Sequence, residues 1–224
     1  MILSQRELRK EVAAGRIKFD PPLEDNQWGE ASIDLRLGTH FTKLQEMPGV
    51  KLSLHQGIPQ VKGLWKTMDK PLQDEFQKAF SYCLEPEEFI LALTHESITV
   101  PPHLIARVEG RSTYARLGIS MHQTAPWIQP GWEGRIVLEI KNSGTVKVEL
   151  SPLLDRPCQI TFFKLTSAVP KKLVYGSKST DRYVRQAHPL DQSKQRSGGK
   201  DAVSGVAAEA RLPKKKKAKR ARPK

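Results

Sequence analysis

Short apolar segments, broken by proline and glycine, run along most of the chain and predict many short strands and few helices. One short helix is expected near the start, because Ser4 and Glu7 have the spacing of a capping box and Gly15 is a helix stop. Leu8 and Val12 share one face of this helix, which we expect to pack on the core.

Alternating apolar and polar residues predict the first strand over residues 31–37, where Ile33, Leu35 and Leu37 lie on one side. Further strands are expected at residues 89–93, 97–100, 104–108, 135–141, 145–150 and 159–165. The sequence Asn-Ser-Gly at 142–144 lies between two of them and predicts a β-hairpin. The pattern therefore predicts an all-β barrel or sandwich with small helical additions.

The alternation weakens between residues 48 and 82, where residues 71–80 are expected to form a short helical or irregular insertion. Beyond residue 190 the chain is rich in small and basic residues that are unlikely to pack into a core. We therefore expect one domain over residues 1–190 and a disordered, Lys/Arg-rich tail over residues 191–224.

The formal net charge of +13 is concentrated at the end of the chain. Residues 211–224 hold nine basic residues and no acid, which leaves 28 basic and 24 acidic residues in residues 1–210. The body is thus only mildly basic. The tail fits either a solvated, disordered segment or an accessory contact with a polyanion such as RNA.

Composition also limits where the protein works. The chain has no apolar run of about 18 residues that could cross a membrane, and its first residues lack the apolar stretch of a secretory signal. Two cysteines, Cys83 and Cys158, are too few for a disulfide scaffold or a cysteine-rich zinc site. A reducing, cytoplasmic setting without membrane association is expected.

Several catalytic motifs are missing from the sequence. It contains no Gly-x-Ser-x-Gly elbow, no Walker loop and no Gly-x-Gly-x-x-Gly. It also lacks the His-x-Glu and Pro-Cys-x-x-Cys pair of the zinc deaminases. Any hydrolytic chemistry is therefore expected to proceed without a zinc ion held by the protein.

Residues 110–118 combine two arginines and two hydroxyl residues between glycines, with Arg111 and Arg116 five positions apart. Arginine binds phosphate oxygens through paired N–H groups, and hydroxyls with turn amides add short donors. The segment fits a polyphosphate site. Taken alone, it fits equally well two surface arginines on a loop.

The strand expected at residues 135–141 carries a second candidate group. Ile136, Leu138 and Ile140 fall on one face, and Glu139 falls on the other. Glu139 is either a solvated strand residue or a general base near a bound ligand. The turn just upstream, at residues 129–134, contains two glycines that allow the backbone to approach a base or sugar closely.

Three blocks together carry a family resemblance: Ala-Ser-Ile-Asp-Leu-Arg-Leu-Gly at 31–38, Gly-Arg-Ser-Thr-Tyr-Ala-Arg-Leu-Gly at 110–118, and Pro-Gly-Trp-Glu-Gly-Arg-Ile-Val-Leu-Glu at 130–139. With these blocks in this order, the chain resembles the dCTP deaminases, which are trimeric relatives of the dUTPases. The resemblance implies a distorted, jelly-roll-like β-barrel of the dUTPase type and hydrolytic deamination of dCTP to dUTP and ammonia. The alternatives are a dUTP diphosphatase, a bifunctional enzyme that converts dCTP to dUMP, or a non-catalytic nucleotide- or RNA-binding protein.

The resemblance also implies roles for individual residues. Glu139 would activate a water for attack on C4 of cytosine, and the main chain of Val137 and Leu138 would contact the pyrimidine. A magnesium ion is expected on the triphosphate rather than in a protein cage. The active site is expected between subunits of a homotrimer. The segment that would hold the triphosphate consists of Arg111, Ser112, Thr113, Tyr114, Ala115 and Arg116.

Other substrate contacts are implied nearer the end of the chain. Gln159 matches a glutamine of the last barrel strand, and a closing segment would contribute Tyr175, Arg182 and Gln186. The chain departs from the family at Gln129, where an aspartate is usual. An amide can bind the deoxyribose hydroxyl but cannot act as a base, which weakens the case for dUTP hydrolysis. The turn at residues 154–157, just before Gln159, also departs from the family pattern.

Overall fold

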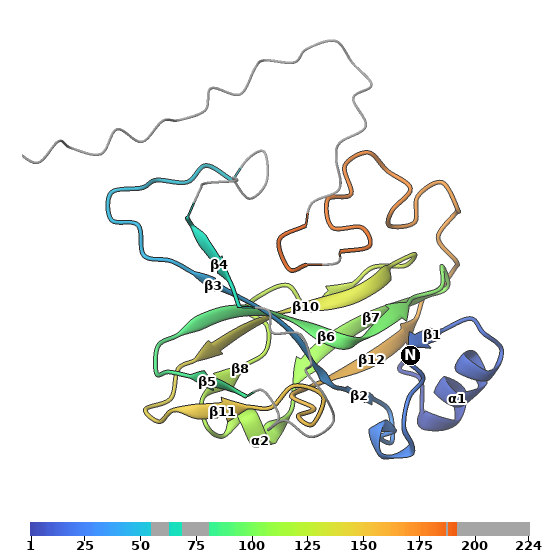
Figure 1. Ribbon diagram of the computed structural model, residues 1–224. Coiled ribbons are helices and arrows are strands. Elements are labelled where there is room, and N and C mark those ends of the chain that lie inside the picture. The colour runs from blue at the N-terminus through green and yellow to red at the C-terminus, as the bar shows by residue number, and fades with distance from the viewer. Residues whose placement is uncertain (55–62, 69–80, 187, 192–224) are drawn as a thin grey trace, which may run out of the picture.

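Figure 1 shows the computed structural model of the protein, which describes residues 1–54, 63–68, 81–186 and 188–191. The insertion expected at residues 71–80 and the tail beyond residue 191 lie outside the described residues. Within the described part, helical structure is limited to α1 (Gln5–Ala13), the 3₁₀ helix η1 (Asp25–Gln27) and α2 (Ser112–Ala115). No helix of this part is long and apolar enough to span a membrane.

Strands make up the body of the protein, as the sequence predicts. They are β1 (Lys18–Asp20), β2 (Ile33–Leu35), β3 (Leu37–Leu44), β4 (Trp65–Thr67), β5 (Tyr82–Leu84), β6 (Phe89–Thr99), β7 (Leu104–Gly110), β8 (Ile119–Ser120), β9 (Trp127–Ile128), β10 (Glu133–Asn142), β11 (Val148–Leu150) and β12 (Cys158–Lys164).

The strands form two larger sheets and a small one. The first sheet has the order β4-β3-β6-β10-β8, with β1 also paired to β6. The second has the order β2-β12-β7-β9, and β11 pairs with β5. One apolar core joins the two larger sheets with α1, and Leu8, Phe41, Leu138 and Phe162 are fully buried in it. Burial of this continuous core is the main stabilising contribution to the fold.

The opening helix is confirmed, but its start differs from the expected capping box. Ser4 occupies the N-cap position without a side-chain cap hydrogen bond. Glu7 instead accepts a hydrogen bond from Lys10 at 2.9 Å. The helix is held by burial of Leu8, and Gly15 ends it with a φ of 66°.

One continuous strand, β6, replaces the two strands expected between residues 89 and 100. The predicted break is wrong because the polar residues in the middle of β6 find partners inside the fold. The Thr94 hydroxyl donates to the Glu96 carbonyl at 2.8 Å. The fully buried Glu96 carboxylate pairs with Arg36 at 2.7 Å. Buried polar groups with such partners are tolerated inside a sheet.

The hairpin expected around residues 142–144 is also wrong. The turn forms, since the Asn142 side-chain oxygen accepts the Gly144 N–H at 2.9 Å. The next strand, β11, then pairs with β5 rather than β10, with Val148 opposite Leu84. The buried amide of Asn142 donates to the Leu84 carbonyl at 3.2 Å and links the turn to β5.

The face assignment of β10 is confirmed. Ile136, Leu138 and Ile140 are buried in the core, whereas Val137 and Glu139 are partly exposed on the opposite face. β10 lies between β6 and β8. It begins at Glu133, after the turn at residues 129–132, and ends near α2. This strand therefore connects the regions that carry the candidate site residues.

Candidate active site

Glu139 is held at the open edge of β10 by the loop after β8. Its Oε2 accepts the backbone N–H of Gln123 at 2.9 Å, and its own N–H donates to the Met121 carbonyl at 3.0 Å. The Gln123 side-chain amide also donates to the Glu139 carbonyl at 3.2 Å. No described residue donates to Oε1 of Glu139, so this oxygen keeps its acceptor capacity.

Val137 directs its main-chain groups to the same edge of β10 as Glu139. In an antiparallel strand, alternate residues point N–H and C=O to the same side. The N–H of Glu139 points to Met121 and away from β6, so the main chain of Val137 also points away from β6. The main chain of Leu138 points toward β6. Val137 therefore offers a donor and an acceptor to a planar ring beside Glu139, and Leu138 does not.

The segment predicted to hold a triphosphate lies at the surface, around α2. Ser112, Thr113 and Arg116 are exposed, so their side chains can reach a ligand. Tyr114 is partly buried, and burial, reinforced by the neighbouring Asp155 carboxylate, raises the pKa of its hydroxyl. Tyr114 therefore acts as a neutral anchor for α2.

Arg111 is held against the sheet instead of extending into solvent. Its Nη1 lies 3.1 Å from Asp34 Oδ2 and donates to the Arg156 carbonyl at 3.3 Å. Burial raises the pKa of Asp34, and the Arg111 and Arg156 guanidinium groups oppose that rise. The expected phosphate-binding arginine is thus already oriented by a carboxylate on β2.

Gln159 lies beside this pair on the second sheet. In the strand ladder Gln159 is directly opposite Asp34 on one side and Glu109 on the other, so the three side chains share a face. Glu109 in turn bonds to His122 Nε2 at 3.0 Å and to Arg107 at 2.5 Å. Burial works to raise the pKa of Glu109, but these two partners outweigh it and lower the pKa.

A shallow cavity of about 380 Å³ lies between the ends of β7 and α2 and the strand β8. It joins the predicted triphosphate segment to the loop that holds Glu139, because the same loop lines one of its walls. Its lining residues are Glu109, Gly110, Ala115, Gly118, Ile119, Ser120, Met121 and His122.

The closing segment (residues 175–186) docks on the turn between β9 and β10. The Tyr175 N–H donates to the Pro130 carbonyl at 2.8 Å, and its ring lies 5.3 Å from the Trp132 ring. The Tyr175 hydroxyl accepts the backbone N–H of Tyr183 at 3.0 Å. Tyr175 therefore holds the start of the closing segment on the turn and also binds the later part of the segment, at Tyr183. Gln129 begins the same turn, and its side chain is exposed.

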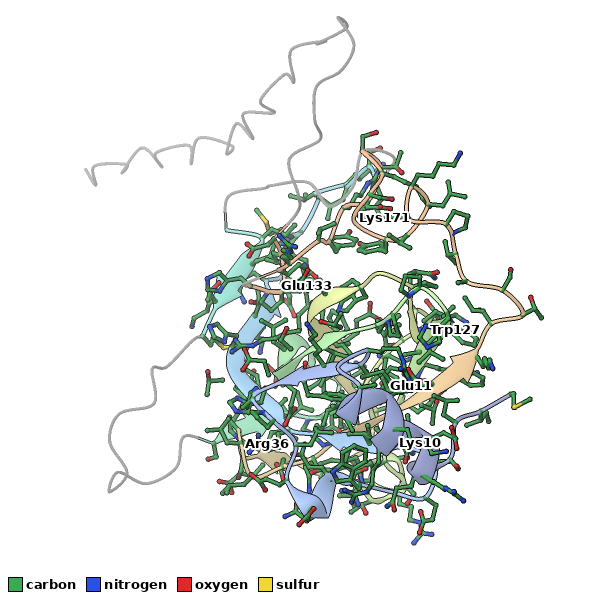
Figure 2. The ribbon with its side chains drawn as sticks, turned by 90° about the vertical axis from the view of Figure 1, so that its right-hand side faces the viewer. Lys10, Glu11, Arg36, Trp127, Glu133 and Lys171 are labelled. Carbon is green, nitrogen blue, oxygen red and sulfur yellow. The ribbon has the colours of Figure 1, made fainter. Side chains whose placement is uncertain are left out.

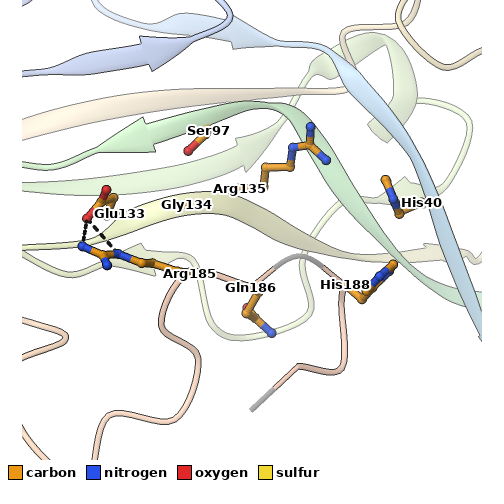
Figure 3. Close-up of a pocket in the computed structure, with 8 residues that line it drawn as sticks. All are labelled: His40, Ser97, Glu133, Gly134, Arg135, Arg185, Gln186 and His188. Carbon is orange, nitrogen blue, oxygen red and sulfur yellow. Dashed lines mark hydrogen bonds and ion pairs between the residues drawn. The ribbon is translucent and has the colours of Figure 1, made fainter. Parts of the chain in front are cut away.

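The end of the closing segment crosses β10 at its first residues. Arg185 pairs with Glu133 at 2.8 Å, as the dashed lines in Figure 3 show. Gln186 is buried, and its amide donates to the Pro189 and Asp191 carbonyls at 3.3 and 2.8 Å. Between the segment and the sheet lies a cavity of about 410 Å³, lined by His40, Ser97, Glu133, Gly134, Arg135, Arg185, Gln186 and His188.

The predicted site residues form two groups at opposite ends of β10. Figure 1 places α2 and the closing segment at opposite ends of the molecule. In Figure 2, Glu133 and Lys171 lie toward the closing-segment end, and Arg36 lies toward the other. β8, which contacts α2, pairs with β10 at Lys141, eight residues from Glu133. At about 3.3 Å per residue this is roughly 26 Å, more than one nucleotide can bridge.

The described residues contain no cluster of three or more His, Cys, Asp or Glu side chains that could hold a metal ion.

A family model described as "dCTP deaminase-like" matches residues 2–165. The chain belongs to this family. Similar curated proteins include a "dCTP deaminase, dUMP-forming" of Methanobrevibacter smithii, 37% identical over 84% of this chain and 92% of its own length. A protein of the same name from Methanothermobacter thermautotrophicus is 39% identical over 84% of this chain and 91% of its own. A "dCTP deaminase" of Alteromonas mediterranea is 33% identical over 84% of this chain and 93% of its own length.

Among solved structures, the deoxycytidine triphosphate deaminase of Agrobacterium tumefaciens matches this dCTP deaminase-like chain with a TM-score of 0.55 at 23% identity. The match covers 76% of this chain and 50% of the other. The two share a fold, and the distorted, jelly-roll-like fold expected from the sequence is confirmed.

Two partners in this dCTP deaminase-like chain were not identified from the sequence. Gln123, which holds Glu139, lies in an irregular loop with no motif of its own. Asp34 lies inside a block used for the resemblance, but its pairing with Arg111 depends on the contact between β2 and the start of α2. Spacing along the chain gives no signal for contacts between such distant segments.

Proposed function

We propose that this chain catalyses the hydrolytic deamination of dCTP to dUTP and ammonia, with Glu139 as the general base. The observation that supports this most directly is the placement of Glu139 beside the open main chain of Val137. One carboxylate oxygen is fixed by the Gln123 N–H at 2.9 Å, and the other remains available to a water. A base held this way can act on a ring whose edge is bound by the adjacent backbone.

In the proposed reaction the Glu139 carboxylate removes a proton from water as the water oxygen attacks C4 of cytosine. The carboxylic acid returns this proton to ring N3. The proton of the new C4 hydroxyl then passes through Glu139 to the exocyclic amine, the C4–N bond breaks, and ammonia leaves. One water is consumed and the triphosphate is unchanged. General base action of this kind contributes about 10²- to 10⁴-fold, so positioning must supply the remainder.

Substrate positioning is proposed to come from the two groups of residues described above. Arg111, Ser112 and Arg116 would bind the triphosphate, which would carry the magnesium ion. Val137 would contact the pyrimidine edge. Further contacts are proposed for Thr113, Tyr114, Ala115, Gln129, Gln159, Tyr175, Arg182 and Gln186.

The separation of these groups supports a site shared between subunits. The points of β10 next to the two segments, Lys141 and Glu133, are about 26 Å apart by strand length. One nucleotide can contact both only if a second copy supplies one of them. We therefore propose a homo-oligomer, and the family resemblance suggests a trimer. Light scattering should give three times the mass of the 25.2 kDa chain.

The second candidate function is the conversion of dCTP to dUMP. The names of the M. smithii and M. thermautotrophicus relatives favour it. Gln129 disfavours it, because an amide cannot deprotonate the water that attacks a phosphate. In this second function the same deamination would be followed by release of diphosphate.

Product identification separates the two candidates. Purified protein is incubated with dCTP and magnesium, and the nucleotides are resolved by anion-exchange chromatography while ammonia is measured. The proposal expects equal amounts of ammonia and dUTP. Ammonia with dUMP and diphosphate would establish the second candidate instead. Intact dCTP without ammonia would refute both.

A further inference from the structure

Asp34 and the Arg156 carbonyl both contact the same nitrogen of Arg111, Nη1. A guanidinium group has five N–H donors in a fixed plane. In Arg111, Nη1 makes both described contacts, 3.1 Å from Asp34 Oδ2 and 3.3 Å from the Arg156 carbonyl. No residue in the described ranges accepts a hydrogen bond from Nε or Nη2 of Arg111. The outer edge of the guanidinium is therefore available for a second, two-pronged interaction.

We propose that Asp34 is a positioning residue for triphosphate binding, which it supports by holding Arg111 with its Nε–Nη2 edge toward the phosphate oxygens. This inference rests on the proposed function, in which Arg111 binds the substrate triphosphate. Arginine binds a phosphate most specifically through two parallel N–H groups on one edge. Asp34 and the Arg156 carbonyl both contact Nη1, on the other side of the Arg111 guanidinium group.

The surroundings of Asp34 make it suited to this role. It lies on β2 between Ile33 and Leu35, which are both fully buried. The Asp34 side chain is 17% exposed, compared with 38% for Arg111. The backbone N–H of Arg111 is also fixed, by the Pro157 carbonyl at 3.0 Å. A partly buried carboxylate on a strand therefore orients a more exposed and intrinsically flexible side chain.

An opposite effect of Asp34 is also physically reasonable. Its negative charge could repel the triphosphate, and its removal would then strengthen binding. Two features favour positioning over repulsion. Arg111 and Arg156 both act on Asp34 and offset its charge. In addition, ordering a flexible side chain at a binding site costs an amount equivalent to about a 2- to 12-fold change in affinity.

The test compares Asp34→Ala with the wild-type protein in dCTP binding and turnover. Asp34→Ala is expected to raise KM and the Kd for dCTP by about 2- to 12-fold, with kcat changed less than about twofold. Asp34→Asn keeps an acceptor oxygen for Nη1 and should give a smaller rise. This second variant also serves if the alanine variant does not fold.

The matched control is Glu11→Ala on α1, labelled in Figure 2. The Glu11 side chain is 16% exposed and pairs with Arg16 at 2.7 Å, so it reproduces the burial and the ion pair of Asp34 away from the proposed site. Its loss should leave KM and Kd unchanged. An equal rise in both alanine variants would mean a general structural effect and would overturn the positioning role.

A double-mutant cycle distinguishes action through Arg111 from a direct effect. In an Arg111→Ala background, Asp34→Ala should produce no further rise in Kd. Additive effects, or an unchanged or lower Kd in Asp34→Ala alone, would overturn the inference. Calorimetric binding of dCTP needs no turnover. If the wild-type protein binds dCTP but releases no ammonia, the proposed function is refuted. The Kd values of the Asp34 and Arg111 variants would still test the positioning role. Absence of dCTP binding would overturn both.

Discussion

A methyl group at Gly131 is expected to displace the closing segment from the rest of the protein. Gly131 has a φ of 91°, a backbone conformation that residues with a side chain rarely adopt. A Cβ added there would lie 2.6 Å from the Val174 Cβ and 2.9 Å from the Tyr175 carbonyl oxygen. Backbone atoms and a Cβ cannot move aside by a side-chain rotation, so Gly131→Ala must shift either the turn or the closing segment.

The contacts that dock the closing segment decide which part moves. The ring contact between Tyr175 and Trp132 contributes about 0.5–1.5 kcal/mol, and the bond from Tyr175 to Pro130 about 1 kcal/mol. The exposed pair of Arg185 and Glu133 adds at most about 1 kcal/mol. Docking is therefore worth about 1.5–3.5 kcal/mol in total. The turn itself is bonded to buried Val100, directly after β6, so release of the closing segment is the less costly response.

Hydrogen exchange measures this release directly. In Gly131→Ala the amides of the closing segment should exchange up to about 100-fold faster, which corresponds to loss of about 3 kcal/mol of local stability. The Tyr183 N–H, bonded to Tyr175 at 3.0 Å, is the most informative amide. Gly15→Ala is the control, because φ is 66° there and nothing lies within 4 Å of the added Cβ. Unchanged exchange in Gly131→Ala, or the same acceleration in both variants, would refute the reasoning.

Three further predictions concern the fold and the tail. Arg36→Met leaves the fully buried Glu96 without its cation and should lower the free energy of unfolding in urea by about 3–5 kcal/mol; a loss under about 1 kcal/mol would contradict this. Burial, and then Arg36, lower the pKa of His95 from its ordinary 6.5, so stability should decrease as the pH falls below 6.5. His95→Gln should reduce that decrease, and an identical pH dependence in both proteins would rule out this cause. Deleting residues 211–224 should preserve ammonia release from dCTP and weaken salt-sensitive RNA binding, whereas loss of activity would count against a separate tail.

Local patterns in the sequence identified the opening helix and the strands with clear apolar segments, such as β7, β10 and β12, but not the short strands β1, β4, β5, β8 and β9. In β10, alternation alone separates buried Leu138 from partly exposed Glu139. Two of the errors, the break in β6 and the hairpin after β10, involve long-range contacts. Glu96 resembles a strand end in sequence, and its burial depends on contacts with Arg36 and Gln27, which lie sixty or more residues away. Asn142 predicts a turn correctly, but the partner of the following strand depends on β5, which lies far back in the chain.

The same distinction applies to the candidate site. Residues within a motif, such as Arg111 and Glu139, can be proposed from sequence because their spacing matches a family. The groups that orient them cannot. Gln123 binds the Glu139 carboxylate through its backbone N–H, which every residue type except proline could supply, so residue type alone does not mark this contact. Asp34 reaches Arg111 through the packing of two distant segments.

Turnover by Glu139→Gln is the most direct test of the general base. The amide keeps the shape of the side chain but cannot take a proton from water. The variant should bind dCTP with an affinity close to that of the wild-type protein and release ammonia at least about 100-fold more slowly. Glu149→Gln, an exposed change on β11, should behave like the wild-type protein. Ammonia release by Glu139→Gln at the wild-type rate would contradict the role proposed for Glu139.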